Sequence, residues 1–115
     1  MNVPGGEIRR VVMQNAAVAT GDGTALPCTQ VSEGAFTAAT FQVVGVTTAT
    51  ITWKGTIDGT NYVEIQATNL NDGTEATTAT ADGIYRITCI GLTDILADIT
   101  AWTSGTITVT GVACA

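Results

Sequence analysis

The residues that could do acid–base chemistry in this sequence are carboxylates, because it contains ten Asp and Glu residues and no histidine. Without histidine, the Ser-His and Cys-His nucleophile systems and the commonest metal ligand are excluded. Asp94 and Asp98 lie in a segment that reads as a strand, where their spacing places them on one face about 13 Å apart. That separation is too large for a catalytic pair. We therefore expect no enzyme activity, no cofactor and no metal.

Other carboxylates occur in Asp-Gly pairs, which are typical of tight turns. In such a pair glycine supplies a positive φ and the Asp side chain bonds to the local backbone. Calcium binding in an EF-hand loop would need acidic or amide residues at alternating positions and a Glu at the twelfth, and no such run exists. We therefore predict turns rather than a metal site. The four pairs are Asp22-Gly23, Asp58-Gly59, Asp72-Gly73 and Asp82-Gly83.

The three cysteines, Cys28, Cys89 and Cys114, are widely spaced and odd in number. This pattern argues against the disulfide framework of a secreted protein and against a metal site. We expect Cys89 to be a small buried hydrophobic residue. Residues 1–10 lack the basic segment and apolar run of a secretory signal. No apolar run approaches the ~20 residues of a membrane helix. We expect synthesis in a reducing cytoplasm and no membrane partner.

Length and charge limit the remaining possibilities. A chain of 115 residues with 45% hydrophobic residues fits one packed domain. We place that domain at residues 10–115, after an N-terminal arm at 1–9 that either reaches a neighbouring molecule or is a loose terminus. The net charge of −6 would repel nucleic acid, and Arg9-Arg10 is the one pair of adjacent basic residues. We therefore expect no nucleic-acid partner.

Apolar and polar residues alternate in short runs separated by glycine-containing turns. This pattern predicts an all-β protein, an antiparallel β-sandwich of about eight strands with jelly-roll or Ig-like connections. We expect the following residues to point inward: Phe41, Val43, Ala49, Ile51, Trp53, Val63, Ile65, Tyr85, Ile87, Cys89, Ile95, Ala97, Ile99, Ile107 and Val109. Strands are predicted near Arg10–Val18, Cys28–Ser32, Phe36–Val44, Thr48–Thr56, Asn61–Ala67, Thr74–Thr80, Gly83–Ile90, Asp94–Trp102 and Gly105–Ala113.

The outward positions of these strands are rich in threonine, a strand former that stays soluble without charge. Such a face is either simply solvated or packed against another protein, where charges would have to be desolvated. We expect Trp53 and Tyr85 in the core. Tyr62 and Trp102 are ambiguous, and together with Arg9 and Arg10 they are our candidate partner-binding residues. The outward threonines are Thr48, Thr50, Thr52, Thr106, Thr108 and Thr110.

The segment from Trp53 to Val63, WKGTIDGTNYV, resembles a hairpin that recurs in β-sandwich proteins of tailed bacteriophage particles. The segments DGIYRI at 82–87 and AWTSGTITV at 101–109 resemble the closing strands of the same proteins. The resemblance covers roughly residues 36–113. The pattern Gly-Thr-x-Asp-Gly-x-x-Tyr is also similar to a hairpin of discoidin-like carbohydrate-binding modules.

The phage resemblance implies a virion structural protein, most specifically a capsid decoration or cement protein that bridges capsid subunits. Its implied partners are the major capsid protein and copies of the chain itself, as a homo-oligomer and potentially a trimer. The alternatives are a neck or tail adaptor, or a carbohydrate-binding module that uses Trp102 and Tyr62 as stacking platforms. The implied location is the virion.

Overall fold

The computed structural model describes residues 8–30 and 34–114, and all regular secondary structure in these ranges is β. The fold therefore confirms the predicted all-β, antiparallel sandwich. No helix in the described ranges could span a membrane. The strands are β1 (Ile8–Ala17), β2 (Leu26–Pro27), β3 (Thr29–Gln30), β4 (Gly34–Ala35), β5 (Ala38–Thr56), β6 (Val63–Glu64), β7 (Ala67–Asn69), β8 (Glu75–Ala76), β9 (Thr78–Ala79), β10 (Gly83–Thr88) and β11 (Asp94–Cys114).

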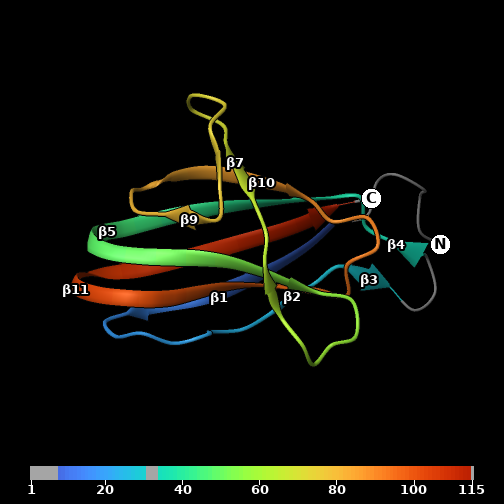
Figure 1. Cartoon of the computed structure of the whole chain (residues 1–115), viewed down its shortest axis with the longest axis horizontal. Helices are drawn as coiled ribbons and strands as arrows, with labels where there is room; N and C mark the ends of the chain where they lie inside the picture. Colours follow the sequence, from blue (N-terminus) through green and yellow to red (C-terminus); the bar gives the residue numbers. More distant parts are fainter. Residues whose placement is uncertain (1–7, 31–33, 115) are drawn as a thin grey trace.

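Two long strands build both layers of the sandwich. β5 and β11 pair antiparallel from Ala38↔Cys114 to Thr56↔Asp94, and the pair folds back on itself (Figure 1). In the first layer the order is β1-β11-β5-β10-β7-β8. In the second layer the other halves of β5 and β11 pair with β2, β6 and β9. The core lies between the two layers.

Two glycines allow the folded-back pair to bend. Gly45 in β5 has φ 89° and Gly105 in β11 has φ 120°, conformations that L side chains rarely adopt. A Cβ at Gly45 would lie 1.8 Å from the carbonyl oxygen of Thr106. The bend is also tied to a neighbouring turn, because the backbone N–H of Val46 donates to Asp82 Oδ1 at 2.8 Å.

Aromatic rings join the two layers at the centre of the core. The Trp53 ring, fully buried on the second-layer half of β5, lies 4.8 Å from the ring of Phe41 and 5.5 Å from that of Tyr85. Phe41 and Tyr85 belong to the first layer, where they are directly paired across β5 and β10. The predicted core positions of Trp53 and Tyr85 are therefore confirmed, as is the burial of Cys89.

Two pairs of predicted strands are single bent strands in the structure. Phe36–Val44 and Thr48–Thr56 were expected as separate strands, but β5 runs without a break from Ala38 to Thr56. Likewise, Asp94–Trp102 and Gly105–Ala113 are halves of β11. The physical reason is that glycine at the predicted turns lets the backbone change direction while the two strands stay paired through register shifts.

Several smaller expectations were also wrong. Val63 was predicted to point inward, but it is 66% exposed because β6 is a two-residue segment paired only at Lys54 and Gly55. Thr52 was predicted outward but is buried, and its hydroxyl is satisfied by that of Thr100 at 2.9 Å. Asp82-Gly83 was predicted to be a tight turn in which the glycine has a positive φ. Gly83 instead begins strand β10 and has no positive φ.

The N-terminal arm predicted at residues 1–9 is described by the structure only in its last two residues. β1 begins at Ile8, so the last two residues assigned to the arm 1–9 are already in a strand. Residues 1–7 of that arm lie outside the described residues, as do 31–33 and residue 115. The last two residues of the strand expected at Cys28–Ser32 fall in this gap.

Candidate binding face

The outer surface of the first layer is a broad face shared by four strands. Alternation along β1, β11, β5 and β10 turns every second side chain away from the core. One row across the sheet runs Arg10↔Val112↔Thr40↔Arg86, and the next runs Val12↔Thr110↔Gln42↔Ile84. We call these eight residues the sheet face. Six of them line a shallow hollow of about 380 Å³: Arg10, Thr40, Gln42, Ile84, Thr110 and Val112.

The sheet face differs in charge from the rest of the chain. None of its eight residues is acidic, although the chain has a net charge of −6. Arg10 and Arg86 stand three strand spacings apart in the same row, which is about 14 Å. Between them lie uncharged side chains, with Val12 49% exposed and Ile84 45% exposed. The sheet face is therefore a partly apolar surface with an arginine at each end of one row. Beyond Arg86 this row continues through Thr68 to Glu75 on β8.

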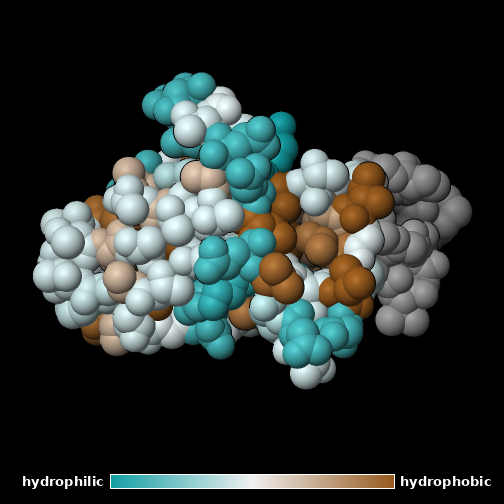
Figure 2. Space-filling model, in the orientation of Figure 1, coloured by the Kyte–Doolittle hydropathy of each residue, from teal (hydrophilic) through white to brown (hydrophobic). Residues whose placement is uncertain are grey.

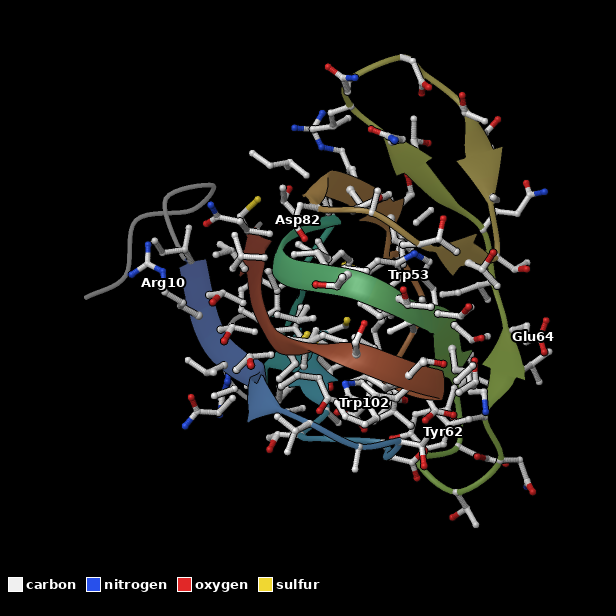
Figure 3. The ribbon with its side chains drawn as sticks, turned by 90° about the vertical axis from the view of Figure 1, so that its left-hand side faces the viewer. Arg10, Trp53, Tyr62, Glu64, Asp82 and Trp102 are labelled. Carbon is white, nitrogen blue, oxygen red and sulfur yellow. The ribbon has the colours of Figure 1, made fainter. Side chains whose placement is uncertain are left out.

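The adjacent arginines of the sequence do not act together. Arg10 belongs to the sheet face, whereas Arg9 is opposite Ala113, in the inward register of β1. Both arginines are nevertheless exposed to solvent. Figure 3 shows Arg10 on the opposite side of the molecule from Glu64, with Trp53 between them. Only one of these two predicted partner-binding residues therefore contributes to the face.

The structure does not bring Trp102 and Tyr62 together. Trp102 pairs with Ala49, while Tyr62 directly precedes Val63, which pairs with Gly55. Six residues along β5 separate the two pairings, or about 20 Å. Trp102 is half-buried and its indole N–H donates to the carbonyl of Gly105 at 3.1 Å. The two rings therefore do not form one stacking platform.

Tyr62 has an environment that disfavours ionisation. Its side chain is half-buried, and burial raises the pKa of its phenol. The carboxylates of Asp94, Asp22 and Asp58 raise this pKa further. The phenol thus lies among acidic residues, away from the cations of the sheet face.

A second exposed surface was missed by the sequence analysis. Val63 and Ile90 are 66% and 67% exposed, and the half-buried Ile65 and Leu92 both lie above Gly55. We call Val63, Ile65, Ile90 and Leu92 the apolar patch. Figure 2 shows hydrophobic side chains gathered beside the polar segment that crosses the front of the molecule. Alternation could not find it, because β6 is short and Ile90 precedes the turn at Gly91.

The carboxylates make structural contacts. Asp98 is bonded to Lys54 Nζ at 2.7 Å, and this hydrogen bond raises the pKa of Lys54. Asp58 accepts hydrogen bonds from the backbone and side chain of Asn61, which hold its pKa well below the usual range. The side chain of Thr74 and its backbone N–H, which donates to Asp72 Oδ1 at 2.9 Å, lower the pKa of Asp72. In the described ranges no three metal-ligating side chains come together.

The fold and the face define a small antiparallel β-sandwich with an exposed, partly apolar sheet surface. The chain belongs to the XepA family, whose sequence model matches residues 7–113. No curated protein matches the sequence.

Two solved structures share the fold. The SPBc2 prophage-derived protein YomS has a TM-score of 0.83 at 17% identity, and the match covers 100% of this chain and 97% of that one. The PBSX exported protein XepA has a TM-score of 0.85 at 20% identity, over 95% of this chain. This chain spans only 38% of the length of XepA. These two likenesses show the fold, and the prophage origin in the name of YomS belongs to that protein.

Proposed function

We propose that the chain is a structural protein of a phage particle, a capsid decoration or cement protein that binds the head surface through the sheet face. The observation that carries this proposal is the sheet face itself. It combines exposed Val12 and Ile84 with two arginines and no carboxylate, in a chain that is acidic as a whole.

The side chains of the sheet face suit a protein partner. Burying Val12 and Ile84 contributes hydrophobic stabilisation, and the threonines between them are desolvated at lower cost than charged residues. Arg10 and Arg86 would pair with carboxylates on the partner, and arginine is enriched in protein interfaces. We propose an acidic surface of the major capsid protein as this partner. Repetition of one modest contact over many sites would stabilise the shell.

The bridging role needs a second contact. The apolar patch supplies a second exposed hydrophobic surface, centred on Ile65 and Leu92 above Gly55. We propose that neighbouring copies of the chain meet there in a symmetric oligomer such as a trimer. Chains bound through the sheet face and joined through the patch would link adjacent capsid subunits.

The test is an add-back experiment on particles that lack this protein. Ile84→Asp places a like charge on the proposed acidic contact and should abolish particle binding, while Arg86→Glu should weaken it. Ile57→Asp is the matched control, because Ile57 is 75% exposed and belongs to neither surface. Equal binding by Ile84→Asp and Ile57→Asp would overturn the proposal.

A second candidate follows from the relative whose name calls it exported. An exported chain would be found in the culture fluid without a particle, so fractionation of the fluid separates the two candidates. A neck or tail adaptor would use the same sheet face at another position. A carbohydrate-binding module is less favoured, because Trp102 and Tyr62 lie about 20 Å apart along the strand.

A further inference from the structure

Two cysteines that are far apart in the sequence are held together at the end of the sandwich away from the Gly45 bend. Four backbone hydrogen bonds link Cys28 to Cys89 along two routes, one through residues 92 and 93 and the other through residues 36 and 37. The N–H of Cys28 donates to Thr93 at 2.8 Å, and the N–H of Leu92 donates to Cys89 at 3.0 Å. The N–H of Cys89 donates to Thr37 at 3.1 Å, and that of Phe36, the residue before Thr37, donates to Cys28 at 3.0 Å.

The side chains of this pair face the same interior. Cys28 and Cys89 are both 0% exposed and belong to one hydrophobic cluster. Burial raises the pKa of both thiols, and the two thiols also interact with each other. Both cysteines are free thiols in this structure, and the Cys28 thiol donates to the carbonyl of Leu26 at 3.6 Å. Two neighbouring enclosed thiols are the kind of pair that a disulfide joins.

The third cysteine is placed differently. Cys114 is opposite Ala38 in the outward register of the first layer, and its Sγ–H donates to the carbonyl of Ala38 at 3.8 Å. The thiol is only half-buried. Cys114 is nevertheless a neighbour of Cys89, because the N–H of Thr37 donates to the Cys114 carbonyl at 2.9 Å and the Cys114 thiol raises the pKa of Cys89. Cys28 and Cys89 form the enclosed pair, and Cys114 lies beside that pair with its thiol half-buried.

We propose that Cys28 and Cys89 form an intramolecular disulfide when the chain meets a small-molecule disulfide under oxidising conditions. One cysteine thiolate attacks the small disulfide, forms a mixed disulfide and releases one small thiol. The second cysteine then attacks the protein sulfur of that mixed disulfide and releases the other small thiol. Two protein thiols are oxidised to one S–S bond, and one small disulfide is reduced to two thiols.

The cross-link would join segments distant in sequence. It connects the end of β2 to the end of β10 and closes the chain from residue 28 to residue 89. The pair would stay reduced in the cytoplasm and would form the bond when the chain folds in an oxidising medium, before burial closes access to the thiols. The inference is independent of the binding partner, because it holds for a chain on a particle and for an exported chain alike.

The experiment refolds the full chain from reduced, denatured protein in a buffer of oxidised and reduced glutathione, so that burial does not limit access to the thiols. Intact mass, alkylation of free thiols and peptide mapping then identify the bond. Wild type and Cys114→Ala should both lose the mass of two hydrogens, and the map should link Cys28 to Cys89. The melting temperature should rise by about 10 °C over the reduced form.

Cys89→Ala should show no mass loss and no rise in melting temperature, since Cys28 then has no enclosed thiol partner. If Cys89→Ala does not fold, the peptide map of wild type and Cys114→Ala decides the question without it. A folded wild-type chain whose three thiols are all alkylated after oxidative refolding would overturn the proposal, and so would a bond that involves Cys114.

Discussion

Substituting Gly45 by alanine tests whether the bend between the two layers depends on glycine. Two costs add at this position. The backbone φ of 89° disfavours any residue with a Cβ, by about 1–2 kcal/mol. The new Cβ would also lie 1.8 Å from the Thr106 carbonyl oxygen, so β5 and β11 must move apart, at about 1–3 kcal/mol for such overpacking. We expect a total loss of about 3 kcal/mol in the free energy of unfolding.

Gly59→Ala is the matched control. Gly59 has a similar φ of 79°, but a Cβ there would meet no atom within 4 Å. It should therefore lose only the conformational cost of about 1–2 kcal/mol. Urea denaturation followed by the fluorescence of the two tryptophans, Trp53 and Trp102, measures both variants at constant m-value. Equal losses for the two variants would refute the idea that close approach of β5 and β11 fixes the bend.

Three further predictions concern the core and the turns. Trp53→Ala should lose about 3–5 kcal/mol of unfolding free energy in urea denaturation followed by circular dichroism, and Trp53→Phe clearly less, since a ring still fills the core. A loss below about 1 kcal/mol for alanine would contradict the buried position. Asp82→Ala removes the acceptor of the Val46 N–H and should lower the free energy of unfolding by about 1 kcal/mol, measured by thermal melting. An unchanged melting temperature would show that the hydrogen bond from Val46 to Asp82 does not stabilise the bend. Hydrogen bonds from Asn61 hold the pKa of Asp58 below its unfolded value of about 3.9, so this stabilisation is complete above that pH and is lost as the pH falls. Asp58→Asn should therefore reduce stability at pH 7 and flatten the acid limb of a stability-against-pH curve, and an unchanged acid limb would contradict this assignment.

Local sequence patterns predicted the core residues and one of the turns, because both features depend on residues that are close together in the sequence. Strict alternation around Phe41, Trp53 and Tyr85 placed those rings in the core correctly. Asp58-Gly59 was recognisable as a turn because the Asp side chain and the glycine φ act within a few residues. The same pattern could not distinguish a turn from a bend at Gly45, since the difference lies in whether β5 and β11 remain paired across it.

The candidate site could not be predicted from local sequence patterns, because its residues come together only through the order of the strands in the sheet. Arg10 and Arg86 share a row only because β11 and β5 lie between β1 and β10, and alternation does not determine strand order. Likewise, Cys28 and Cys89 approach each other through backbone pairing with residues 36, 37, 92 and 93. Their wide spacing in the sequence suggested unrelated thiols.

The position and copy number of the chain in the phage particle test the central claim most directly. Electron microscopy of purified particles, with quantitative gel analysis, would measure both. Our account predicts density for the chain on the head, at a copy number comparable with the major capsid protein, with Arg10 and Ile84 turned toward the shell. A chain that is absent from the particle and recovered only from the surrounding fluid would contradict it.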